Sequence, residues 1–186
     1  MSLKQQLILK RERWSVRFAK RWQAIQLPIA KKTLTQILIC LPEENSYSPI
    51  DLIADYQNLF ADSRLLFCAA HHLAERISSS TNCFYYKLEE LPLWRKLTIP
   101  LTELLAARQF EMAVDLNTTL SLPAALICMT TKAPLRISFA KPDADLFYNV
   151  QVQIQDKGQS MQNKLATFRK HLQPLINCRK QSEPIL

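Results

Sequence analysis

The chain contains a single glycine, Gly158, among its 186 residues. Glycine ordinarily makes up about 7% of a protein, because it adopts left-handed backbone angles and allows close backbone approach without strain. Motifs that need several glycines are therefore excluded, among them the G-x-G-x-x-G dinucleotide loop, the phosphate-binding P-loop and the G-x-S-x-G nucleophile elbow. A nucleotide or a catalytic serine would have to be held in some other way.

The positive charge is concentrated at the N-terminus. Residues 1–32 carry nine basic side chains and one acidic one, Glu12, and so account for the whole net charge of +8. The remaining 15 basic and 15 acidic side chains, all within residues 33–186, cancel. We therefore divide the chain into a basic arm, residues 1–32, and a neutral domain, residues 33–186. Such an arm predicts an anionic partner, either membrane headgroups or nucleic acid.

The arm has the periodicity of an amphipathic helix. Its apolar stripe consists of Leu3, Leu7, Trp14, Phe18, Trp22 and Ile25. Two interpretations stay open: the stripe docks on the domain, which is the simpler one, or the helix lies on an anionic surface, as basic helices with tryptophans do. For the second interpretation the candidate contact residues are Lys10, Arg13, Arg17, Lys20, Trp14 and Trp22.

The sequence predicts a cytoplasmic protein that is at most peripherally attached to a membrane. It has no apolar run long enough to span a bilayer, and its N-terminus does not have the pattern of a signal peptide. Its five cysteines include no C-x-x-C pair, and Cys40, Cys68, Cys83 and Cys128 lie in apolar or strand-like runs, where we expect buried, unreactive thiols. We expect no cofactor and no metal site, since Cys68 and His71 have ligand-like spacing but no second pair has zinc spacing.

Short apolar runs alternate with helical patterns along the domain. The expected strands are residues 33–41, 64–70, 82–86, 110–116, 135–139 and 147–154, and the expected helices are residues 48–60, 71–77, 101–108, 120–131 and 159–178. Ser48 before Pro49 begins the first of these helices, and its expected inner face is Ile50, Ile53, Ala54 and Leu59 or Phe60. The alternation predicts an α/β fold: a single Rossmann-like three-layer sandwich with a mostly parallel sheet, plus the N-terminal amphipathic helical arm.

One strand–helix–strand block, residues 110–140, resembles the N-terminal Rossmann-like domain of heptosyltransferase-type glycosyltransferases. The matching residues are Phe110, Val114, Asp115, Leu116, Ala133, Arg136, Ile137 and Phe139. The chain departs from the family pattern at Glu111, where Asp is usual, and at Ser138, where glycine is usual. Residues 42–45 (PEEN) also lack the glycine of the family loop that carries an acidic catalytic residue.

The resemblance implies a stand-alone relative of the acceptor-binding half of these bacterial enzymes, because the chain has no room for the second domain, which binds the nucleotide sugar. We therefore expect a non-catalytic binding or scaffold domain acting at the cytoplasmic membrane surface. Two alternatives stay open: a glycosyltransferase-type enzyme subunit that needs a partner, and a nucleic-acid-associated protein that uses the basic arm. A protein partner or a homo-oligomer is compatible with each of them.

Four polar residues follow strands that should end at the same edge of the sheet. They are Glu43, Asp115, Asn117 and Thr118. Ligands of open parallel sheets bind beyond the carboxyl ends of the strands, so these four are the candidate ligand-binding residues. If Glu43 and Asp115 converge, they form a carboxylate pair suited to acid–base work or cation binding. The plainer interpretation is that Asp115 or Asn117 caps the next helix and that Glu43 lies in a solvated loop. We assign no catalytic residue.

Overall fold

The computed structural model describes residues 6–7, 9–13, 34–79, 81–87, 99–155 and 158–177. Its strands form a six-stranded sheet in the order β3-β2-β1-β4-β5-β6, and every pairing is parallel. The strands are β1 (Gln36–Cys40), β2 (Arg64–Ala70), β3 (Cys83–Tyr86), β4 (Met112–Asp115), β5 (Leu135–Phe139) and β6 (Val150–Val152). The helices are α2 (Pro49–Leu59), η2 (His71–Arg76), α3 (Ile99–Ala106), α4 (Leu122–Thr130), η4 (Ala144–Leu146) and α5 (Met161–Asn177).

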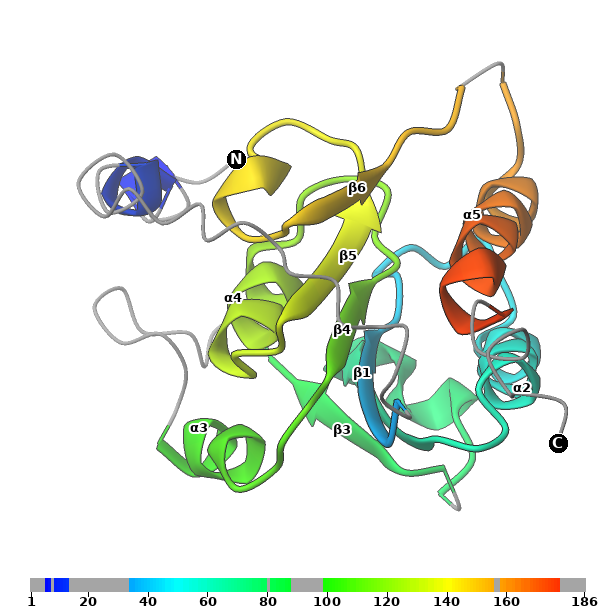
Figure 1. The fold of residues 1–186 in the computed structure, drawn as a ribbon, viewed down its shortest axis with the longest axis horizontal. Coiled ribbons are helices and arrows are strands. Elements are labelled where there is room, and N and C mark those ends of the chain that lie inside the picture. The colour runs from blue at the N-terminus through cyan, green and yellow to red at the C-terminus, as the bar shows by residue number, and fades with distance from the viewer. Residues whose placement is uncertain are drawn as a thin grey trace, which may run out of the picture.

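Helices cover both faces of the sheet (Figure 1). On β1, Ile37 and Ile39 pack into the core beneath α2 and α5, whereas Leu38 and Cys40 pack into the core beneath α4. Alternate residues of a strand point to opposite faces, so a stretch buried on both faces is apolar, as β1 is from Ile37 to Cys40. The expected Rossmann-like three-layer sandwich is confirmed, and the sheet is parallel in all its described pairings.

The inner face predicted for α2 is partly wrong. Ile50 is 57% exposed and Ala54 is exposed, whereas Leu52, Ile53 and Tyr56 are buried. Ser48 does cap the helix, accepting a hydrogen bond from the backbone N–H of Asp51. Pro49, in the first turn, is itself buried, so the buried stripe runs three, four and seven residues on from it rather than from Ile50. The helix expected at 71–77 is a 3₁₀-helix at His71–Arg76, and α3 spans Ile99–Ala106 rather than the expected 101–108.

Among the residues that the structure describes, two non-glycine residues take the left-handed backbone angles that glycine usually supplies. Lys132, which follows α4, has φ of 55°, and Asp143, which precedes η4, has φ of 62°. The backbone N–H of Lys132 donates to the carbonyl of Met129, as in a glycine-terminated helix. These positions show how the chain completes its turns with one glycine, Gly158, itself at φ of 69°.

The described residues of the arm pack on the domain. Residues 9–13 are helical, Leu9 is 3% exposed in the core beneath α4, and Arg13 donates two hydrogen bonds to Asp143, at 2.6 and 3.0 Å. Leu7, expected on the inner stripe, is 50% exposed instead. Residues two apart on a helix point in nearly opposite directions, so Leu7 cannot face the core when Leu9 does.

The other proposed contact residues divide between described and undescribed parts of the chain. Lys10 is exposed. Trp14, Arg17, Lys20 and Trp22 lie outside the described residues. Among the described residues, no helix is both long enough and apolar enough to cross a membrane.

Candidate functional site

The carboxyl ends of β1 and β4 meet at the centre of the sheet. The chain runs from β1 outward through β2 and β3, then returns to β4 on the other side of β1 and continues outward, so the strand order reverses at this pair (Figure 1). Ligands of open α/β folds bind at such a switch point. Cys40, the last residue of β1, is paired in register with Asp115, the last residue of β4. Glu43, Asn117 and Thr118 follow these two ends, as the sequence predicted.

Asp115 is fully buried and accepts four hydrogen bonds. Its Oδ2 accepts from Lys141 Nζ at 2.7 Å and from the Tyr148 hydroxyl at 2.6 Å. Its Oδ1 accepts from the side-chain Nδ2 of Asn117 at 2.6 Å and from the backbone N–H of Asn117 at 3.0 Å. The side chains of Asp115 and Lys141 are 0% and 2% exposed, so the centre of the site is a buried ion pair.

Lys141 and Tyr148 were missed by the sequence analysis. Both lie in the segment between β5 and β6, which contains η4 and no longer helix. Lys141 Nζ also donates to the carbonyl of Asn117 at 2.7 Å and lies 5.3 Å from the centre of the Tyr148 ring. One signal was available: Lys141 comes two residues after the end of β5, at the same edge of the sheet as Asp115.

Glu43 has its own set of partners. Its Oε1 accepts from the Tyr86 hydroxyl at 2.8 Å and from the Ser121 hydroxyl at 2.5 Å. Its backbone N–H donates to Asn117 Oδ1 at 2.9 Å, while Asn117 Nδ2 donates to Asp115. Asn117 therefore connects the two carboxylate residues, and each carboxylate is bound to different donors. The structure brings Glu43 and Asp115 into one network, with no direct hydrogen bond between them.

The expected capping role of Asp115 or Asn117 is wrong, because Ser121 is the N-cap of α4 and accepts from the backbone N–H of Ala124. Three residues separate Asn117 from the cap, so neither side chain reaches the first turn. Thr118 lies nearer the surface and donates to Glu44 Oε1 at 2.8 Å. Of the four candidate residues, Thr118 is the one outside the Asp115 and Glu43 network.

Both tyrosines of the network remain hydrogen-bond donors at neutral pH. Burial, with the nearby charge of Asp115 as the next cause, raises the pKa of Tyr148 well above 10. Burial likewise raises the pKa of Tyr86, with smaller contributions from Cys68 and from the carboxylate of Glu43. The arrangement is thus a set of fixed donors around two carboxylates. Among the described residues, no three His, Cys, Asp or Glu side chains are arranged to hold a metal ion.

The fold of this chain is similar to that of a solved glycosyltransferase structure. No protein-family model matches the chain, and no curated protein matches it. The crystal structure of the glycosyl transferase family 9 from Veillonella parvula DSM 2008 superposes with a TM-score of 0.53 at 11% identity, over 83% of this chain and 45% of that chain. The chain therefore spans less than half the length of that protein. The likeness confirms the glycosyltransferase-like Rossmann fold that the block at residues 110–140 suggested.

Proposed function

We propose that this chain is a non-catalytic binding or scaffold domain built on a glycosyltransferase-like fold. The observation that carries the proposal is the buried Asp115–Lys141 pair. It occupies the switch point, where a related fold would receive its ligand. Each oxygen of Asp115 already has two donors, so the carboxylate has no lone pair left over for a substrate hydroxyl.

A ligand would have to displace these partners. Removing one member of a buried ion pair costs about 3–5 kcal/mol, because the other charge is left unpaired. A ligand that displaced Lys141 without supplying another cation to Asp115 would bind more weakly by that free energy. The affinity would then fall about a hundredfold or more. The network thus favours a closed surface over a substrate site.

The isolated chain should not bind nucleotide diphosphate sugars. A diphosphate binds best at a helix N-terminus with open backbone N–H groups. Here Ser121, the cap of α4, donates its hydroxyl to the carboxylate of Glu43, so a negative side chain already lies at that end. Isothermal calorimetry with uridine, adenosine and guanosine diphosphate sugars should show no binding heat at millimolar ligand. Micromolar binding that Asp115→Ala abolishes would contradict the proposal.

A second candidate is an enzyme subunit that needs a partner. The observation that favours it is the 45% coverage of the glycosyl transferase chain, which leaves more than half of that protein without a counterpart here. Under this alternative, sugar transfer would appear only when a donor-binding protein was added, and Asp115→Ala would then abolish it. If the chain is a scaffold, Asp115→Ala should change its stability, and neither the unsubstituted chain nor the variant should transfer sugar.

We further propose that the basic arm contacts an anionic membrane surface on the cytoplasmic side, with nucleic acid as the alternative partner. Its support is the charge excess within residues 1–32 and the exposure of Lys10. Arg13 is compatible with such contact, because its side chain is 58% exposed even while paired with Asp143.

Deleting residues 1–26 should abolish co-sedimentation with phosphatidylserine vesicles and also lower the melting temperature, because Leu9 leaves the core. A charge variant separates the two effects. Replacing Lys10, Arg17 and Lys20 with Gln keeps Leu9 and should lose vesicle binding at unchanged melting temperature. A charge variant that still binds vesicles, or one that instead loses only binding to DNA or RNA, would overturn the membrane assignment.

A further inference from the structure

Three cysteine thiols meet inside the domain. Cys40 ends β1, Cys68 is its register partner on β2, and Cys128 lies on α4. All three are fully buried, and the sulfurs of Cys40 and Cys128 are 3.6 Å apart. The sequence predicts buried thiols, but only the fold brings Cys40 and Cys128, which are 88 positions apart, into sulfur–sulfur contact.

We propose that Cys40 and Cys128 form a disulfide when the protein is exposed to hydrogen peroxide, which would tie the end of β1 to α4. The sulfur of Cys40 attacks one peroxide oxygen, the O–O bond breaks, and Cys40 becomes a sulfenic acid while one water leaves. The sulfur of Cys128 then attacks the sulfenic sulfur, the S–S bond forms, the S–O bond breaks, and a second water leaves. Two thiols lose two electrons to one hydrogen peroxide, which balances the step.

The geometry requires a small movement. A disulfide needs a sulfur–sulfur distance of about 2.05 Å, so the two sulfurs must approach by about 1.5 Å. Rotation of the two side chains and a slight shift of α4 can bring the sulfurs together. Such a shift is available because Cys128 lies on a helix packed against the sheet and not on a neighbouring strand. Hydrogen peroxide is about the size of water, so it reaches a buried sulfur through local openings that exclude a bulky disulfide reagent.

The contact and the burial of the two thiols both affect their pKa values. The hydrogen bond from Cys128 lowers the pKa of Cys40 and so opposes the rise that Cys68 and burial cause, although the net pKa of Cys40 still lies above its ordinary value. The same hydrogen bond, together with burial, raises the pKa of Cys128. Little thiolate therefore forms on either sulfur at neutral pH. The reaction is slow, because both thiols are buried.

This disulfide would affect the candidate site directly. Cys40 is paired in register with Asp115, so the new bond would form next to the residue that anchors the buried network. The inference is independent of the proposed function, since it concerns the thiols and not any ligand.

The test uses the full chain with Cys178→Ser, which removes the cysteine outside the described residues. Folded, reduced protein is treated with hydrogen peroxide, quenched with catalase, alkylated in denaturant, digested and analysed by mass spectrometry. We expect one reductant-sensitive linked peptide that contains Cys40 and Cys128. Cys83→Ser, a matched control at the partly exposed thiol, should keep the linkage, and Cys128→Ala should lose it.

Two results would overturn the proposal. One is that Cys40 and Cys128 are recovered alkylated while Cys83 is oxidised, which would show that the buried pair is inert. The other is that the folded protein links Cys40 to Cys68, which would show that the sulfur contact does not select the pair. Both results come from the protein that retains its four described cysteines, so neither depends on whether a cysteine variant folds.

Discussion

Replacing Lys141 with Met is expected to lower the free energy of unfolding by about 3–5 kcal/mol, because it leaves the carboxylate of Asp115 buried without its cation. Met fills a similar volume, so the loss reports the charge rather than a cavity. Urea unfolding followed by circular dichroism measures it. A loss of this size is a large share of the 5–15 kcal/mol that holds an ordinary domain together.

The control is the double variant Asp115→Asn with Lys141→Met, which removes both charges. It should be more stable than Lys141→Met alone, since no unpaired charge remains inside. Breaking the exposed pair with Asp143→Asn should cost less than about 1 kcal/mol, because water screens Arg13. Equal losses for the buried and the exposed pair would show that Lys141 is solvated in solution.

Raising the pH above 10 should unfold the protein over about one to two pH units. Burial is the main cause that raises the pKa of the four buried tyrosines above 10, namely Tyr47, Tyr56, Tyr86 and Tyr148. The unfolded chain releases these protons near pH 10, and the folded chain keeps them, so stability is fully present below pH 10 and falls as the pH rises further. Each tyrosine contributes up to about 1.4 kcal/mol per pH unit to the slope.

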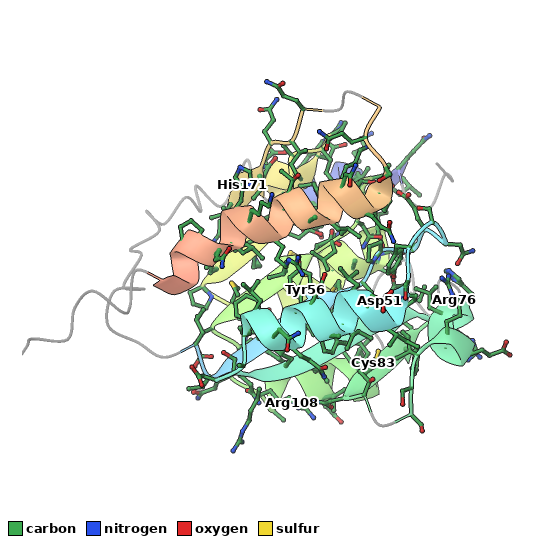
Figure 2. All side chains as sticks on the ribbon, turned by 90° about the vertical axis from the view of Figure 1, so that its right-hand side faces the viewer. Asp51, Tyr56, Arg76, Cys83, Arg108 and His171 are labelled. Atoms are coloured by element: carbon green, nitrogen blue, oxygen red, sulfur yellow. The ribbon has the colours of Figure 1, made fainter. Side chains whose placement is uncertain are left out.

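Tyr56 offers the matched variant for this test. It belongs to α2 and lies on the side of that helix that faces α5 (Figure 2). Tyr56 is fully buried, and among the described residues its hydroxyl is the buried side-chain polar atom without a hydrogen-bond partner. Tyr56→Phe should leave stability at pH 7 unchanged or raise it by about 1 kcal/mol, and should reduce the alkaline slope by one proton. Tyr148→Phe should reduce the slope equally but lower stability at pH 7, because Asp115 loses a donor. An alkaline slope that Tyr56→Phe leaves unchanged would show that this phenol titrates normally in the folded state.

Most of the fold could be predicted from local sequence. The strand at 64–70 was predicted with the bounds of β2, because the six-residue apolar run at 65–70, bounded by Arg64 and His71, has few other structures available to it. The cap at Ser48 followed from its position before Pro49. The phase of α2 could not be predicted as well, because Ile50 and Leu52 are equally apolar and tertiary packing decides which of them is buried.

The sequence predicted where the candidate site lies in the fold, but it did not predict which side chains bind its carboxylates. Asp115, Asn117 and Glu43 were placed at the switch point because parallel strands bring their carboxyl ends to one edge. Their partners could not be predicted, because Lys141 and Tyr148 are separated from Asp115 by 26 and 33 positions, and only the packed segment after β5 brings them together. The contact between Cys40 on β1 and Cys128 on α4 could not be predicted for the same reason.

Closure of the switch point by Lys141 is the basis of the proposed function, and proton exchange at the ammonium group of Lys141 measures that closure. We predict a distinct Lys141 ammonium signal in nitrogen–proton correlation NMR at neutral pH, protected from solvent exchange by Asp115 and the carbonyl of Asn117. The signal should vanish in Lys141→Arg, which assigns it, and should not move when a nucleotide sugar is added. An ammonium group of Lys141 that exchanges as fast as those of surface lysines, or one that shifts on titration with a nucleotide sugar, would contradict the account.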